Sequence, residues 1–259
     1  MPLHTTEAVV IGSKDLGEAD RIVSFYTRDR GKVRAVAEGA RRIRSRFVGS
    51  LELFAFGKLV YFERPNKSLH KVNEFGLLEP FRALREALEL FVQSAYVVEL
   101  VDLAVEEGEA NEELFSLLLQ ALRLLAQGVD PALLQRAFEI RLLKLLGYLP
   151  ELRSCVLCRT PLSGAEPLML SPSQGGLLCQ DCRQEGGDGL LISPPSLAFL
   201  KGVLRMEFAT LARIGLSPEA KAELVQVLRA WLFYFLGRGL RSADFLSRLL
   251  LPLEGGGKG

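Results

Sequence analysis

Four cysteines lie close together in the second half of the chain, as two pairs that each enclose two other residues. Cys155 pairs with Cys158, Cys179 pairs with Cys182, and 20 residues separate the two pairs. A gap of two residues lets both thiolates of a pair reach one ion from a tight turn, and two such turns complete a tetrahedron. The spacing therefore predicts one Zn²⁺ per chain, held by all four cysteines.

Other chemistry is less consistent with these cysteines. A thioredoxin-like dithiol would place one pair at the start of a helix after a strand, and neither pair has that setting. A catalytic zinc needs an open coordination position, and four cysteine ligands leave none. A deaminase-type site also needs a His-x-Glu element, whereas the only histidines are His4 and His70. The predicted metal is therefore structural, and its role is to hold a loop.

The rest of the chain offers few catalytic candidates. It contains no phosphate-binding loop of the Gly-x-x-x-x-Gly-Lys-Ser/Thr kind and no dinucleotide motif. Asp15, Glu18 and Asp20 surround Gly17 and could form a metal or acid–base site, but turn hydrogen bonds and an ion pair with Arg21 explain them better. We therefore expect a protein that is not an enzyme, with a hydrolase of unrecognised site as an alternative.

A cluster of basic residues near the N-terminus is the second candidate site. Arginine in a loop can follow phosphates and stack on bases, and the segment 39–46 lacks helical periodicity and is typical of a loop between strands. The alternative is a basic surface that only aids solubility. The candidate nucleic-acid-binding residues are Arg28, Lys32, Arg34, Arg41, Arg42, Arg44 and Arg46. Seven aromatic residues are interleaved with this cluster, and we expect most of them to lie in a core.

Charge is unevenly distributed along the chain. Residues 1–80 carry a net charge of +4, residues 81–150 of −5 and residues 151–259 of +2. The basic N-terminal segment therefore points to a nucleic-acid partner, and the acidic middle does not. No apolar run is long enough to span a bilayer and the N-terminus has no export signal, so we expect a cytoplasmic protein without a membrane partner.

The elements that position these residues change character near residue 80. Before it, short β-rich runs separated by turns predict strands over residues 7–11, 20–27, 32–38 and 69–75, with another pair over 51–56 and 58–63 hinged at Gly57. Five or so short antiparallel strands in under eighty residues predict a small closed barrel.

After residue 80 the apolar spacing becomes helical. One helix is predicted over residues 81–106, and the next is capped by Asn111. A third begins at Asp130 and ends at Gly147, a fourth runs from residue 193 to about 213, and a fifth from Ser217 to Leu236. The fold class is thus α+β with several domains: a barrel over 1–79, helical parts over 80–152 and 185–252, a zinc module over 153–184, and a disordered tail over 253–259.

Three sequence segments resemble the RecO family of bacterial DNA repair and recombination mediators. The first comprises residues 17–23, 27, 31–33 and 39–42. The second is residues 145–152 leading into Cys155, and the third is residues 240–242. The similarity spans nearly the whole chain and stays in register, and this chain has the four cysteines that not every family member keeps.

The resemblance implies that the barrel is an oligonucleotide-binding (OB) fold that binds single- and double-stranded DNA. It also implies strand annealing and, together with RecR, loading of RecA onto DNA coated by single-stranded-DNA-binding protein, in the cytoplasm at the nucleoid. By position, Arg41, Arg42, Arg44 and Arg46 would track phosphates, helped by Lys32 and Arg34. A groove for the acidic tail of the coating protein is expected among Lys201, Arg205 and Arg241. The alternative function is a zinc-ribbon or OB-fold protein of RNA binding or transcription.

Overall fold

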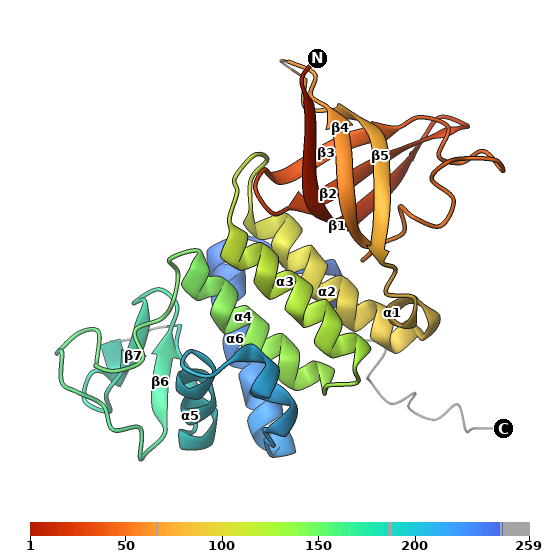
Figure 1. Cartoon of the computed structure of the whole chain (residues 1–259). Coiled ribbons are helices and arrows are strands. Elements are labelled where there is room, and N and C mark those ends of the chain that lie inside the picture. The colour runs from red at the N-terminus through yellow and green to blue at the C-terminus, as the bar shows by residue number, and fades with distance from the viewer. Residues whose placement is uncertain (66, 186–187, 244, 246–259) are drawn as a thin grey trace, which may run out of the picture. The chain divides into compact units, whose positions relative to one another are not determined.

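The computed structural model describes residues 1–65, 67–185, 188–243 and 245 (Figure 1). The chain forms two compact units: residues 1–127 with the end of the chain from Leu240, and residues 128–239. The predicted tail over 253–259 lies outside the described residues. None of the described helices combines the length and the apolar character needed to cross a membrane.

The first unit begins with a closed five-stranded barrel, drawn red to orange in Figure 1. Its strands follow one another around the barrel in the order β1-β2-β3-β5-β4, and only the β3–β5 pair is parallel. The strands are β1 (Leu3–Leu16), β2 (Asp20–Thr27), β3 (Gly31–Ala37), β4 (Phe56–Phe62) and β5 (His70–Glu79). The predicted barrel is therefore confirmed, and alternate residues such as Val33 and Ala35 fill its core.

The predicted strand over residues 51–56 is wrong. Residues 51–55 form turns, in which Phe54 takes a left-handed φ of 74° and its buried side chain packs on Phe91. The Phe54 N–H donates to Val10 O at 2.9 Å, so this segment is pinned to β1 without extending the sheet. Gly57 is not a hinge either. It lies within β4, where a Cβ would come within 2.5 Å of Gly76 O.

The barrel is followed in the chain by α1 (Ala83–Glu86), α2 (Leu88–Ala104) and α3 (Glu112–Ala126). The predicted single helix over 81–106 is broken at Ala87, which is extended. A continuous helix would place Leu84 and Leu88 on one face, but Leu84 is fully buried while Leu88 is exposed, and the break allows this difference. The predicted cap is confirmed, because Asn111 Oδ1 accepts the Leu114 N–H at 2.9 Å.

The second unit contains α4 (Pro131–Leu145), α5 (Pro194–Val203) and α6 (Pro218–Leu236), with a small sheet in the order β7-β6-β8. Its strands are β6 (Leu168–Ser171), β7 (Gly176–Leu178) and β8 (Leu190–Ile192). The helix starts predicted at Asp130 and Ser217 are confirmed, and both side chains accept a backbone N–H of the first turn.

The predicted helix from residue 193 to about 213 stops early. The α-helix ends at Val203, and a separate 3₁₀ segment covers Phe208–Arg213. In a longer helix, Val203 O would accept a hydrogen bond from the following turn. Instead the guanidinium of Arg141, from α4, donates to that carbonyl at 2.9 and 3.1 Å. A tertiary contact therefore ends the helix.

Gly31 offers a test of how the barrel is joined to the segment before α3. Its φ is +63°, and a Cβ there would lie 2.3 Å from the carbonyl oxygen of Glu109. Gly17 has a similar φ of +60° with nothing within 4 Å of the added atom. We expect Gly17→Ala to lower the free energy of unfolding by about 1 kcal/mol, from the left-handed backbone alone. Gly31→Ala should lower the free energy of unfolding by at least about twice as much, because the backbone at Glu109 must also shift. Chemical denaturation of both variants measures the difference, and equal losses would contradict the close approach.

Candidate nucleic-acid interface and metal centre

The four cysteine sulfurs converge on one point of the second unit. All four Sγ atoms lie within 4.8 Å of one another, and those of Cys158 and Cys179 are 3.7 Å apart. Cys155 is buried, Cys158 is exposed, and Cys179 and Cys182 are partly buried. No cysteine is in a disulfide. The structure therefore brings together the four residues that the spacing singled out.

Backbone hydrogen bonds hold the two cysteine turns in place. Cys155 N–H donates to Thr160 O at 2.9 Å, closing the first turn, and Val156 N–H donates to Leu177 O at 2.9 Å. Because Leu177 belongs to β7 and Cys179 directly follows that strand, the second bond sets the spacing between the pairs. The short sheet β7-β6-β8 thus positions the cluster.

The electrostatics of the cluster favour a bound cation. Burial raises the pKa of the Cys155 thiol, but N–H groups of Cys179, Cys158 and Leu157 act on its sulfur and lower the pKa to about 6. Cys182 behaves oppositely, because its thiol hydrogen-bonds to Cys179 and its pKa rises to about 12. Four negative sulfurs this close repel one another, so they ionise together only around a positive ion. The cluster therefore fits a metal ion.

Four of the seven basic candidates are engaged in ion pairs within the first unit, and three of them lie outside the loop that follows β3. Arg28 contacts Glu7 and Glu112 at 2.7 and 2.8 Å, and both partners raise its pKa through hydrogen bonds. The ammonium of Lys32 lies 3.3 Å from an Asp102 carboxylate oxygen and also donates to its carbonyl at 2.7 Å.

Arg34 is the third paired cation, and its guanidinium lies 3.5 Å from a Glu107 carboxylate oxygen. Apart from Glu7 in β1, the acidic partners of these cations belong to residues 102–112, from the end of α2 to the start of α3, which we call the acidic segment. Its backbone also pairs with β3, since Gly108 N–H donates to Lys32 O at 3.1 Å.

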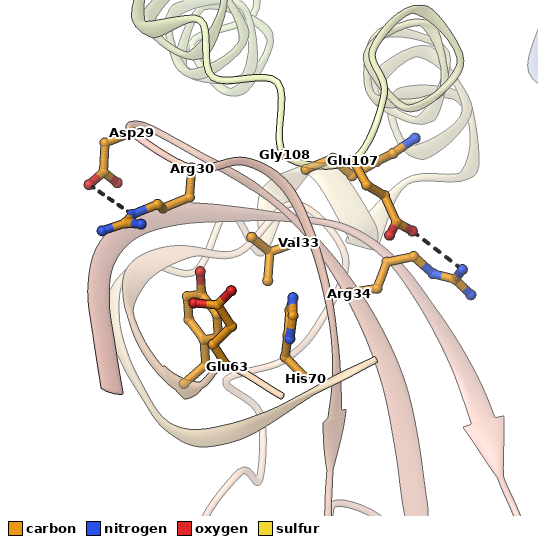
Figure 2. Close-up of a pocket in the computed structure, with 10 residues that line it drawn as sticks. Asp29, Arg30, Val33, Arg34, Glu63, His70, Glu107 and Gly108 are labelled. Atoms are coloured by element: carbon orange, nitrogen blue, oxygen red, sulfur yellow. Dashed lines mark ion pairs between the residues drawn. The ribbon is translucent and has the colours of Figure 1, made fainter. Parts of the chain in front are cut away.

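A pocket of about 450 Å³ opens beside these ion pairs. Figure 2 shows the Arg34 and Glu107 side chains pointing toward each other at its edge. Glu63 also lines the pocket and accepts a hydrogen bond from His4 at 2.6 Å, and His70 Nδ1 accepts the Arg64 N–H at 3.2 Å. Its walls carry both signs of charge, so this pocket is not a continuous track for a polyanion.

The remaining four candidates lie in the connection after β3. We call residues 39–48 the arginine loop. Arg41 donates to Gly17 O, in the β1–β2 turn, at 2.9 Å and lies 3.4 Å from Asp15 near the end of β1. Asp15 also pairs with Arg21 at 3.5 Å, which confirms the structural interpretation of that carboxylate.

Arg42, Arg44 and Arg46 have no carboxylate partner among the described residues, and all three are exposed. Arg46 lies over the ring of Phe47, 4.8 Å from its centroid. The structure thus divides the candidates into two groups. Arg28 in the turn after β2, Lys32 and Arg34 on β3, and Arg41 in the arginine loop all face carboxylates. Arg42, Arg44 and Arg46 face solvent.

A second pocket, of about 280 Å³, lies in the second unit. Two of its lining residues, Lys201 and Arg205, were expected to form a partner groove. Arg241 does not line the pocket. Its backbone N–H donates to a Glu99 carboxylate oxygen at 3.0 Å, within the first unit. The pocket residues are Lys144, Leu149, Pro150, Glu151, Leu152, Arg153, Lys201, Leu204 and Arg205.

Sequence reasoning missed two features of these sites. Lys144 and Arg153 line the second pocket, and nothing in their local sequence indicates that they meet Lys201. The pairing of Arg28, Lys32 and Arg34 with the acidic segment was also missed. A signal for it existed, because neighbouring segments of charge +4 and −5 attract each other.

Comparison with known proteins agrees with this architecture. A family model described as "Recombination protein O N terminal" matches residues 1–81, and "Recombination protein O C terminal" matches residues 85–244. Similar proteins are named "DNA repair protein RecO". That of Pelotomaculum thermopropionicum is 36% identical, covering 96% of this chain and 95% of the relative. That of Roseiflexus sp. is 40% identical, covering 94% and 85%, and that of Symbiobacterium thermophilum is 36% identical, covering 96% and 98%.

The cysteine cluster predicts one tightly bound metal ion per chain, measured by elemental analysis of the purified protein. Cys155→Ser should lose most of the metal and lower the melting temperature, because the three remaining ligands leave the turn unsupported. Ser163→Ala, in the same loop but outside the cluster, should change neither. A metal-free native protein in which all four thiols react freely would contradict the site.

Proposed function

This chain belongs to the RecO family of DNA repair proteins, and we propose that its arginine loop binds single- and double-stranded DNA. The observation that carries the proposal is the exposure of Arg42, Arg44 and Arg46 without carboxylate partners among the described residues. A strand that follows these guanidinium groups releases its counterions, which supplies affinity independent of sequence. Arg28, Lys32 and Arg34 contribute less in this proposal, because carboxylates already neutralise them.

We further propose that the protein anneals strands and, with RecR, helps to load RecA onto DNA coated by single-stranded-DNA-binding protein. Annealing is opposed by repulsion between phosphates, which arginines from one loop reduce when both strands are bound. Annealing and loading in this way need no catalytic group and no nucleotide hydrolysis, so in this proposal the protein is not an enzyme. It would act in the cytoplasm, on the nucleoid.

The cysteine cluster is proposed to hold one Zn²⁺ with a structural role. Zinc prefers four ligands in a tetrahedron, and thiolates suit it better than they suit Mg²⁺ or Ca²⁺. With Cys155, Cys158, Cys179 and Cys182 all as ligands, the ion keeps no open position for water or substrate. When bound it would link the two cysteine turns beside the short sheet.

The second pocket is proposed to receive the acidic C-terminal tail of the coating protein. Its wall carries Lys144, Arg153, Lys201 and Arg205, opposed by Glu151, and Leu149 and Leu204 add apolar surface. A peptide that ends in carboxylates and an apolar side chain matches this mixture. Binding both the tail and the DNA would raise the effective concentration of each contact.

Two double variants of equal charge test the DNA site. Arg44→Ala with Arg46→Ala should weaken binding to single-stranded DNA and slow annealing. The slope of log affinity against log salt should fall by about 0.7 for each lost phosphate contact. Arg28→Ala with Arg34→Ala removes the same charge from the same barrel and should change the slope much less.

Fluorescence anisotropy at several salt concentrations measures both slopes, and thermal denaturation checks that each variant is folded. An unchanged slope in the Arg44 and Arg46 variant, with normal folding, would remove the arginine loop from the DNA site.

Lys201→Ala with Arg205→Ala tests the second pocket. We expect binding of an acidic tail peptide to weaken about tenfold or more, because two cations of the wall are lost. DNA affinity should stay unchanged, and isothermal titration calorimetry measures the peptide affinity. Arg183→Ala with Arg213→Ala, outside the lining residues, is the control of equal charge. Equal effects of the two double variants would show attraction by net charge without a specific pocket.

A further inference from the structure

Ile43 is an apolar side chain in an unfavourable place. Its side chain is 97% exposed, more than any other large apolar residue among those described. It stands between Arg42 and Arg44 at the tip of the arginine loop. A single exposed apolar residue is common on protein surfaces. Ile43 differs because arginines flank it on both sides in the chain, so a ligand that contacts these arginines also meets an apolar side chain.

The turn that carries Ile43 is held in one shape. Ser45 N–H donates to Arg42 O at 3.0 Å, so Ile43 and Arg44 are the two central residues of a β-turn. Gly, Pro, Asn, Asp and Ser are the residues that such turns favour, so turn geometry does not account for isoleucine.

Contacts on both sides fix the turn to the barrel. On one side, Arg41 N–H donates to Ala19 O at 2.9 Å and Gly39 N–H donates to Asp20 Oδ1 at 2.7 Å. On the other side, the side chains of Phe47 and Leu51 are buried in the barrel core. Ile43 is thus presented on a supported tip.

The charges around the tip decide what can cover Ile43. Arg42, Arg44 and Arg46 would repel a basic surface and leave a purely apolar partner with unpaired cations. DNA offers phosphates on both sides of an apolar stack of bases. Isoleucine has no flat face on which a single unpaired base could stack, whereas a branched aliphatic side chain fits between two base pairs that have been partly unstacked.

We propose that Ile43 is a wedge that enters a base step of duplex DNA and partly unstacks it, while the neighbouring arginines hold the flanking phosphates. The wedge rests on the proposed DNA site in the arginine loop and adds an activity to it: local distortion of a duplex without fuel. Opening a step in this way would lower the barrier to exchanging one strand for another. The bend that accompanies it would bring more of the backbone against the arginines.

The test uses the full-length protein and a duplex that carries 2-aminopurine, whose fluorescence rises when its stacking is lost. Saturating protein should raise the fluorescence, and Ile43→Ser should remove most of that rise while weakening duplex affinity about threefold to tenfold. Ile43→Leu should retain the rise, because it keeps an apolar wedge. Val48→Ser is the matched control, since Val48 is also exposed in the same loop but is not flanked by two arginines.

Three outcomes would overturn the wedge. One is an undiminished fluorescence rise with Ile43→Ser at saturation, and another is no rise with the unaltered protein. The third is a change of oligomeric state in Ile43→Ser without DNA, measured by analytical ultracentrifugation, which would assign Ile43 to contact with a second copy. Failure of the DNA site itself is distinguished by the salt slope of the Arg44 and Arg46 variant, which does not depend on Ile43.

Discussion

The contacts between β3 of the barrel and the acidic segment, which we call the join, hold the first unit together. Lys32 is its centre, because its backbone pairs with Gly108 and its ammonium binds both the carboxylate and the carbonyl of Asp102. Beside it, Tyr26 is buried so deeply that its pKa rises to about 12, with the nearby Glu109 charge adding to the effect. Hydrogen bonds and charge pairs at partly buried positions are stronger than the same pairs in open solvent. This join therefore fixes β2 and β3 against the segment that leads into α3.

The same join decides which arginines remain for a ligand. A cation that already faces a carboxylate gains little from a phosphate, because the first partner must be displaced. Arg28 and Arg34 are in that position, whereas Arg42, Arg44 and Arg46 lie in the loop after β3 and have no ion pair with the acidic segment. The carboxylates of the acidic segment thus belong to the architecture of the first unit, and their pairing leaves the unpaired arginines of this set in one supported loop.

The second unit is stabilised in a different way. Its helices α4 and α6 begin at side-chain caps. Specific side chains tie its helices together: Arg141 donates to the last carbonyl of α5, and Lys221 of α6 pairs with Asp130, before α4, at 2.5 Å. Its sheet is short, with strands of three and four residues. A sheet of this size buries little apolar surface, so the metal ion proposed at the cysteine cluster would supply a constraint that a larger core would otherwise give.

Local chemistry written in the sequence determined the closed barrel, the caps at Asn111, Asp130 and Ser217, the Cys-x-x-Cys pairs and the family resemblance. Each depends on residues that are neighbours in the chain, or on a fixed period. The tertiary structure alone decided the turns at residues 51–55, the break at Ala87 and the end of α5. Each depends on burial or on a contact with residues distant in sequence, which the local sequence does not reveal. It also separated paired from exposed arginines, because the fate of a charge depends on which distant carboxylate lies within about 4 Å of it.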